Sequence, residues 1–81
     1  MSEKNFYEEL GSRIRDKREK KGYKTINQIC LELAEYGLDI SESMFGKYEL
    51  GTQKISVFRL AVVAKVLDCD VSELIPEIEA C

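Results

Sequence analysis

The stretch from Thr25 to Gly51 reads TINQICLELAEYGLDISESMFGKYELG and predicts two helices joined by a turn. Thr25 and Gln28 have the spacing of a capping box, which predicts that a helix begins directly after Thr25. Its apolar stripe consists of Ile26, Ile29, Cys30, Leu33 and Ala34. Gly37 is a natural end for this helix, because glycine is the common residue just past a helix C-terminus.

A shorter helix follows, capped by Ser41 and running through about Glu49. The acidic residue Glu42 stands in its first turn, where negative charge favours the helix dipole. Gly51 ends the helix, and residues 52–55 are expected to form a loop. The apolar side is made by Met44, Phe45 and Tyr48.

Three further helices are predicted by their caps and apolar periods. The first spans about Asn5–Lys21, and the fourth is capped by Ser56. Asp70 and Glu73 form a second capping-box pattern that starts a short fifth helix, closed by Pro76. The core face of the fourth helix is made by Leu60, Val63, Ala64 and Leu67.

The length and composition fit one all-α domain. The chain has 81 residues, of which 44% are apolar and 33% are charged, which is enough to close one core but not two. We expect a single domain over residues 1–81, with a core at about 5–76 and a short acidic tail at 77–81. No apolar run approaches a membrane span and no signal-peptide pattern is present, so a soluble, cytoplasmic protein is expected.

Cysteine and histidine usage argues against metal sites and catalysis. Cys30, Cys69 and Cys81 show no C-x-x-C spacing, and the chain has no histidine, so neither a metal nor a cofactor is expected. Without a phosphate-cradling glycine loop, and with short helices that leave little room for a substrate cavity, we expect neither an enzyme nor a small-molecule site. At the chain end, Cys81 is a candidate for an exposed, oxidisable thiol.

Three sequence motifs follow one another along the chain. They are Leu10-Gly11-x-Arg13-Ile14-Arg15-x-x-Arg18-x-x-x-Gly22, then Glu49-x-Gly51, then Leu60-x-x-Val63-Ala64-x-x-Leu67-x-Cys69-Asp70-x-x-Glu73-Leu74. Together they resemble the Cro/C1-type (XRE) helix-turn-helix family over about residues 8–75. The resemblance implies a compact five-helix, lambda-repressor-like domain that binds double-stranded DNA sequence-specifically. We expect a transcriptional regulator, a repressor that binds an inverted-repeat operator as a homodimer with helix 42–49 in the major groove.

The resemblance also implies which residues read bases. These are Ser41, Glu42, Ser43 and Lys47, of which Lys47 is the favoured donor to guanine O6 and N7. Glu42 could only accept a hydrogen bond, for example from a cytosine amino group. The alternative, which we favour, is that its negative charge stabilises the N-terminus of the helix through the helix dipole. The expected main role of Ser41 is to cap the helix.

Phosphate contacts are expected where helices begin and in the loop after the recognition helix. The candidates are Lys24, Thr25, Gln28, Thr52, Gln53, Lys54 and Ser56. The alternative for Lys54 is an ordinary solvated loop residue. Arg18 and Glu49 match a pair that forms a partly buried structural ion pair in the family, so they are expected to stabilise the fold rather than to bind DNA.

Charge is distributed unevenly along the chain. Residues 13–24 carry a net charge of +5, although the whole chain carries −3, so the rest is strongly acidic. Such a chain is expected to bind DNA through its local field, with weak non-specific affinity and a modest salt dependence. The C-terminal stretch 66–81 has no Lys or Arg, so it should face away from DNA. There Leu74, Ile75 and Ile78 form either a dimer contact or an ordinary core-closing segment.

Three features keep a second function open. They are Glu42, the acidic net charge, and Ile26, which stands where family members often carry a phosphate-contacting Gln. The segment from Cys30 to Glu49 is also longer than in the commonest members of the family. The alternative is a protein-interaction module, or antitoxin-like partner protein, that keeps the helix-turn-helix fold without strong operator binding. Binding to any duplex at low salt distinguishes the two.

Overall fold

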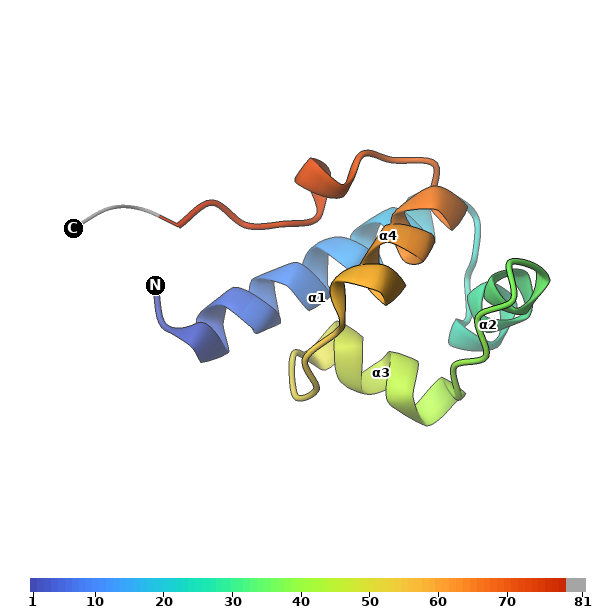
Figure 1. The fold of residues 1–81 in the computed structure, drawn as a ribbon, viewed down its shortest axis with the longest axis horizontal. Coiled ribbons are helices and arrows are strands. Elements are labelled where there is room, and N and C mark those ends of the chain that lie inside the picture. The colour runs from blue at the N-terminus through green and yellow to red at the C-terminus, as the bar shows by residue number, and fades with distance from the viewer. Residues whose placement is uncertain (79–81) are drawn as a thin grey trace.

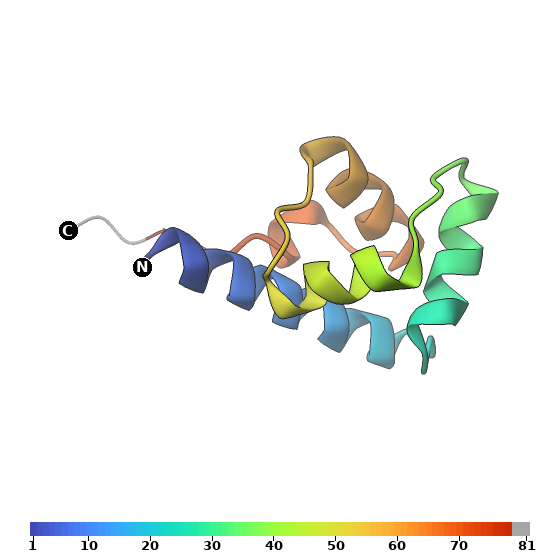
Figure 2. The same ribbon diagram turned by 90° about the horizontal axis from the view of Figure 1, so that it is seen from below.

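The computed structural model describes residues 1–78, which form four α-helices and one 3-10 helix (Figure 1). The elements are α1 (Glu3–Lys20), α2 (Ile26–Glu35), α3 (Glu42–Leu50), α4 (Val57–Val66) and η1 (Val71–Glu73). In Figure 2, α3 runs alongside α1, and α2 stands across the end at which α3 begins. Within the described range no helix is long and apolar enough to cross a membrane.

Every element begins at a side-chain cap that accepts a backbone N–H. The capping residues are Ser2, Thr25, Ser41, Ser56 and Asp70. Both predicted capping boxes are present, at Thr25 with Gln28 and at Asp70 with Glu73. The predicted start of the first helix was wrong, because the Ser2 hydroxyl accepts from the Asn5 amide and α1 therefore begins at Glu3.

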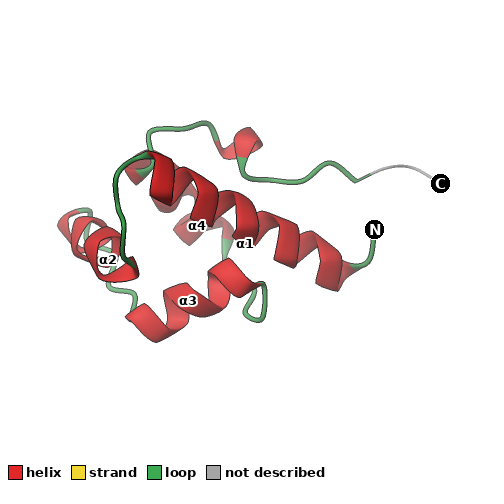
Figure 3. Cartoon of the chain, turned by 180° about the vertical axis from the view of Figure 1, so that it is seen from behind, coloured by secondary structure: helices red, strands yellow, loops and turns green. Residues whose placement is uncertain are grey.

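The turn between α2 and α3 is anchored by apolar side chains. Gly37 has a φ of 80°, a left-handed conformation that glycine adopts without steric cost. Leu38 and Ile40 then return to the core, where both are buried. The segment 36–41 is therefore fixed in place, although it forms no helix; in Figure 3 this loop lies largely behind α2.

The core lies between α1, α3 and α4 and is closed at one end by α2. Its fully buried side chains are Ile14, Ile29, Leu33, Phe45, Val63 and Leu74. Each of the four α-helices supplies at least one of these side chains, and so does the segment after η1, so the whole domain contributes to the core. Phe45 and Tyr48 of α3 meet edge to face, with ring centroids 6.5 Å apart.

Helices α1 and α3 approach each other through glycine. A Cβ on Gly11 would overlap the backbone carbonyl oxygens of Tyr48 and Glu49. At Gly51, which has a φ of 79°, a Cβ would lie 2.6 Å from the backbone of Glu8. The two helices therefore touch backbone to backbone, and side chains at these two positions would force them apart.

The prediction of a fifth α-helix was wrong in kind, although its cap was placed correctly. After Asp70 the chain makes only the 3-10 turn η1. The residue before a proline is disfavoured from helical geometry, so Pro76 prevents the helix from continuing through Ile75. The segment closes the core through Leu74, whose side chain is fully buried.

Candidate nucleic-acid interface

The outward side of α3 is polar and uncrowded. Glu42, Ser43 and Lys47 are exposed, whereas Phe45 and Tyr48 face the core. Short or flexible side chains on one exposed helix face allow a close approach to base edges in a major groove. The structure thus places three of the four residues expected to read bases on one surface, and Ser41 caps the same helix.

Two lysines on this side of the molecule are available to a ligand. Lys47 lies on α3, and Lys24 directly precedes the cap of α2; both are exposed. Within residues 1–78 neither forms an ion pair with a carboxylate. Their charge is therefore not already neutralised by the protein.

Glu42 connects the two helices of the pair. The Asn27 side-chain amide in α2 donates to Glu42 Oε2 in α3 over 3.2 Å. Glu42 also lies in the first turn of α3, where its charge is favourable. These contacts give Glu42 a structural role and leave its second carboxylate oxygen as an acceptor.

The loop after α3 holds its predicted phosphate contacts in different ways. The Thr52 hydroxyl donates to the Lys47 carbonyl oxygen over 3.4 Å, so it helps to close the end of α3. Gln53 is exposed. Lys54 Nζ lies 3.0 Å from Glu3 Oε2 and 5.9 Å from the centre of the Tyr7 ring. The contact with Glu3 raises the pKa of Lys54.

The hydroxyls at the starts of α2 and α4 are already used as caps. Thr25 accepts from the Gln28 amide, and the Gln28 side-chain oxygen accepts from the Thr25 amide. The Ser56 hydroxyl accepts from the Arg59 amide. A hydroxyl that accepts in this way retains its own hydrogen, and the Gln28 side chain retains its NH₂, so all three can still donate to a phosphate.

A buried ion pair holds α3 against α1. Arg18 Nε donates to Glu49 Oε2 over 2.6 Å, and Arg18 Nη2 donates to Glu49 Oε1 over 3.3 Å. The side chains are only 6% and 7% exposed. Arg18 also donates to the Tyr23 carbonyl oxygen over 2.8 Å. This bidentate pair fixes the orientation of the exposed face of α3 relative to the rest of the domain.

A second contact that sequence reasoning missed ties α3 to α4. Arg59 Nη1 donates to the Tyr48 hydroxyl oxygen over 2.8 Å. Arg59 lies in the first turn of α4, so this bond positions the Ser56 end of α4 beside α3. No local pattern marks such a pair, because the two residues belong to different helices.

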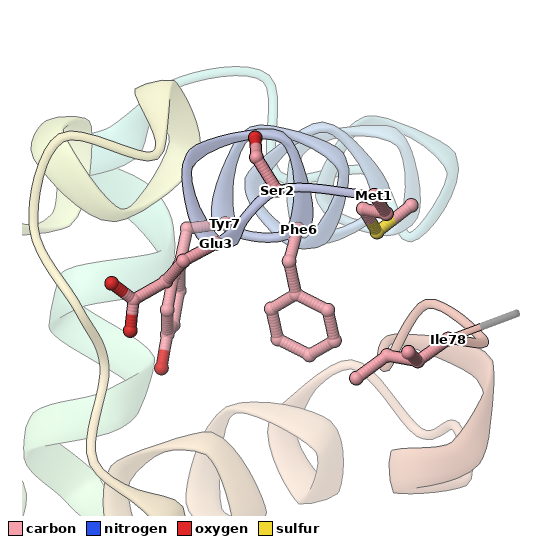
Figure 4. Close-up of a pocket in the computed structure, with 6 residues that line it drawn as sticks. All are labelled: Met1, Ser2, Glu3, Phe6, Tyr7 and Ile78. Carbon is pink, nitrogen blue, oxygen red and sulfur yellow. The ribbon is translucent and has the colours of Figure 1, made fainter. Parts of the chain in front are cut away.

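The C-terminal residues expected at a dimer contact separate into two groups. Leu74 is fully buried in the core, as the core-closing alternative expects and not as a dimer contact requires. Ile75 and Ile78 are 40% and 74% exposed. Both lie beside shallow apolar hollows that share Phe6, one of which is drawn in Figure 4 with Ile78 facing the ring of Phe6. Val57, 83% exposed, lines the other hollow.

The cysteines offer no reactive site in the described part of the chain. Cys30 and Cys69 are free and half-buried, and burial raises the pKa of both thiols, which keeps them protonated. No group of three potential His, Cys, Asp or Glu ligands occurs within residues 1–78. Cys81 and the end of the acidic tail lie outside the described residues.

A solved structure of a DNA-binding domain has a fold similar to that of this protein. No family model and no curated protein matches the sequence. The chain is similar to the crystal structure of the DNA-binding domain of BldD, with a TM-score of 0.73 and 27% sequence identity. The match covers 94% of this chain and 100% of that one. The protein thus has the all-helical, helix-turn-helix fold of a DNA-binding domain.

Proposed function

We propose that the protein is a sequence-specific, DNA-binding transcriptional regulator of the Cro/C1 (XRE) type, a cytoplasmic repressor without enzymatic activity. The observation that carries this proposal is the match of nearly the whole chain to the DNA-binding domain of BldD, together with the exposed polar face of α3. In the proposed complex α3 lies in the major groove, and Lys47 donates to guanine O6 and N7. Ser41 and Ser43 complete the base-reading face, with Glu42 as an acceptor.

Contacts to the DNA backbone surround this face in the proposed complex. They come from Lys24, Thr25 and Gln28 at the start of α2, and from Thr52, Gln53, Lys54 and Ser56 between α3 and α4. Such contacts fix the position of the protein on the duplex but do not read sequence. Lys24 and Lys47 contribute most, because the protein leaves their charges unpaired, whereas Lys54 must first leave Glu3.

A homodimer follows from the proposed inverted-repeat operator and is supported by an apolar face. This face consists of Phe6, Val57, Ile75 and Ile78, which line two adjoining hollows. Continuous exposed apolar surface on a small domain marks an interaction site, and a second copy of the chain supplies the matching surface. Val57→Glu should shift the protein toward monomer in sedimentation, while Leu31→Glu, at an exposed position on α2, should not. An equal effect of the two variants would exclude this face.

The test of DNA binding is fluorescence anisotropy with the duplex upstream of the protein's own gene and a shuffled control. We expect Lys47→Ala to weaken binding to the native duplex and to reduce its preference over the control, because a good base contact contributes about 1–3 kcal/mol of discrimination. Lys65→Ala removes the same charge at an exposed position of α4 and should leave the preference for the native duplex unchanged. Loss of preference in both variants would contradict the assignment of Lys47.

The second candidate function is a protein-interaction module or antitoxin-like partner. Two contacts favour it: Glu3 neutralises Lys54, and Asn27 holds Glu42 on the face that would meet DNA. Both place carboxylates close to the proposed interface, which opposes phosphate binding. Absence of binding to either duplex at low salt would favour this candidate over the first.

A further inference from the structure

A hollow at the junction of three helices is not part of the predicted contact set. It has a volume of about 340 Å³ and is lined by Arg15, Arg18, Ile26, Gly46, Glu49 and Leu50. Figure 2 shows the C-terminal half of α1, the start of α2 and the length of α3 lying together in this region. Gly46 keeps the hollow open, since a Cβ there would find only Ile26 Cδ1, at 3.7 Å.

Two walls of this hollow are apolar, and the two buried charges that line it neutralise each other. Leu50, in the last turn of α3, is 67% exposed, and Ile26 is half-buried beside it. Arg18 and Glu49 satisfy each other at the base, so neither offers a free charge. The available ionic group is therefore Arg15.

Arg15 is weakly held by the protein. Its side chain is 62% exposed, and its Nε lies 3.9 Å from Glu19 Oε1, the neighbouring carboxylate one turn further along α1. An exposed pair at this separation contributes little and is readily exchanged for another anion. A planar guanidinium at the rim of an apolar hollow is well suited to a phosphate group whose attached sugar packs against the walls.

We propose that this hollow holds one sugar-phosphate unit of a DNA strand, with the deoxyribose against Ile26 and Leu50 and the phosphate against Arg15. The inference rests on the proposed function. If Lys47 contacts a base, the neighbouring residue Gly46, and the hollow that it lines, lie close to the DNA strand. A sugar-phosphate unit is favoured over a base, since apart from the Arg15 guanidinium the walls offer no free donor or acceptor with which to read a base edge. The DNA interface thus extends from the helix pair onto α1.

The test compares two arginines of the same helix. Arg13 lies on another side of α1, where it donates to Glu9 and to the Ile75 carbonyl oxygen and lines a separate hollow with Lys17 and Glu73. Arg15→Ala and Arg13→Ala remove the same charge and the same side chain. Thermal unfolding first establishes that both variants are folded at the temperature of the binding assay.

Binding of each variant to one duplex is then measured by anisotropy across a range of salt concentrations. We expect Arg15→Ala to reduce the salt slope by about one and the affinity by roughly five- to tenfold at 0.1 M salt, because one phosphate contact is lost. Arg13→Ala should change the slope little. Equal changes in both variants would overturn the inference, since they would report a general loss of positive field, while DNA binding itself would stand. Failure of the unaltered protein to bind any duplex would instead overturn the proposed function and this inference with it.

A second measurement locates the phosphate. Neutral methylphosphonates are placed one at a time along each strand of the duplex. At one position the substitution should weaken binding of the unaltered protein and of Arg13→Ala but not of Arg15→Ala. If every position affects all three proteins equally, Arg15 does not contact the backbone.

Discussion

Replacing Gly11 with alanine should separate α1 from α3. Alanine is normally preferred to glycine inside a helix by about 1 kcal/mol, so the local effect of the change favours folding. The added Cβ, however, would overlap the carbonyl oxygens of Tyr48 and Glu49. Those oxygens belong to the α3 backbone and cannot rotate aside as a side chain would.

The expected size of the effect follows from these opposing contributions. Overpacking a well-filled contact costs about 1–3 kcal/mol and more where the backbone must move. A shift of α3 also stretches the bond between Arg18 and Glu49, which is buried and sensitive to geometry. We therefore expect Gly11→Ala to lower the free energy of unfolding by about 2 kcal/mol or more, which corresponds to a fall in Tm of roughly 10 °C for a domain of this size.

Gly46→Ala is the matched control, since it makes the same change inside α3. There the nearest atom to the new Cβ lies at 3.7 Å, an ordinary van der Waals distance. This variant should gain about 0.5–1 kcal/mol from helix propensity. Both are measured by urea unfolding followed by circular dichroism. If Gly11→Ala were as stable as Gly46→Ala, the backbone contact between α1 and α3 would not be a close one.

Three further variants test other contacts. Glu49→Ala should lower the unfolding free energy by about 3–5 kcal/mol in urea, because it leaves the charge of Arg18 buried and unpaired; a loss below about 1 kcal/mol would contradict a buried pair. Glu3→Gln should raise the affinity for a non-specific duplex at low salt about two- to threefold by releasing Lys54, and unchanged anisotropy would show that Glu3 does not compete. The Lys17 ammonium lowers the pKa of Glu73 below its ordinary 4.5, so this contact stabilises the fold above that pH and its contribution is lost as the pH falls through the lowered value. The fall in Tm between neutral pH and about pH 3 should therefore be smaller in Glu73→Gln.

The starts of most elements could be predicted because a helix cap is a local signal. Thr25 with Gln28, and Asp70 with Glu73, act over three residues, and the same atoms make the contact in the folded protein. The Ser2 cap, and with it the start of α1 at Glu3, was missed because the apolar period begins only at Phe6. The last element was placed correctly but is a 3-10 helix, a difference that its cap does not reveal, since a cap marks where a helix begins and not which kind of helix follows.

Contacts between elements could not be predicted from the residues alone. Sequence periodicity identifies Leu74 and Ile78 as apolar, but only the packing shows that the first is buried and the second exposed. Likewise, nothing around Gly11 in the sequence indicates that α3 crosses it. The expected contact set similarly omitted Arg15, because its proximity to Gly46 and Leu50 depends on how α1 and α3 cross.

The crossing of α1 and α3 has a consequence for how such a domain tolerates insertions. α3 packs more extensively against α1 than against α2, and its cap, its ion pair and its glycine contact do not involve the segment 36–40. The connection between the two helices should therefore accept added residues at the exposed positions Gly37 and Asp39 without tilting α3, as long as Leu38 and Ile40 keep their places in the core. A library of loop lengths that keeps these two residues should accordingly yield folded proteins more often than a library at the loop 51–55, where Gly51 lies against the backbone of α1.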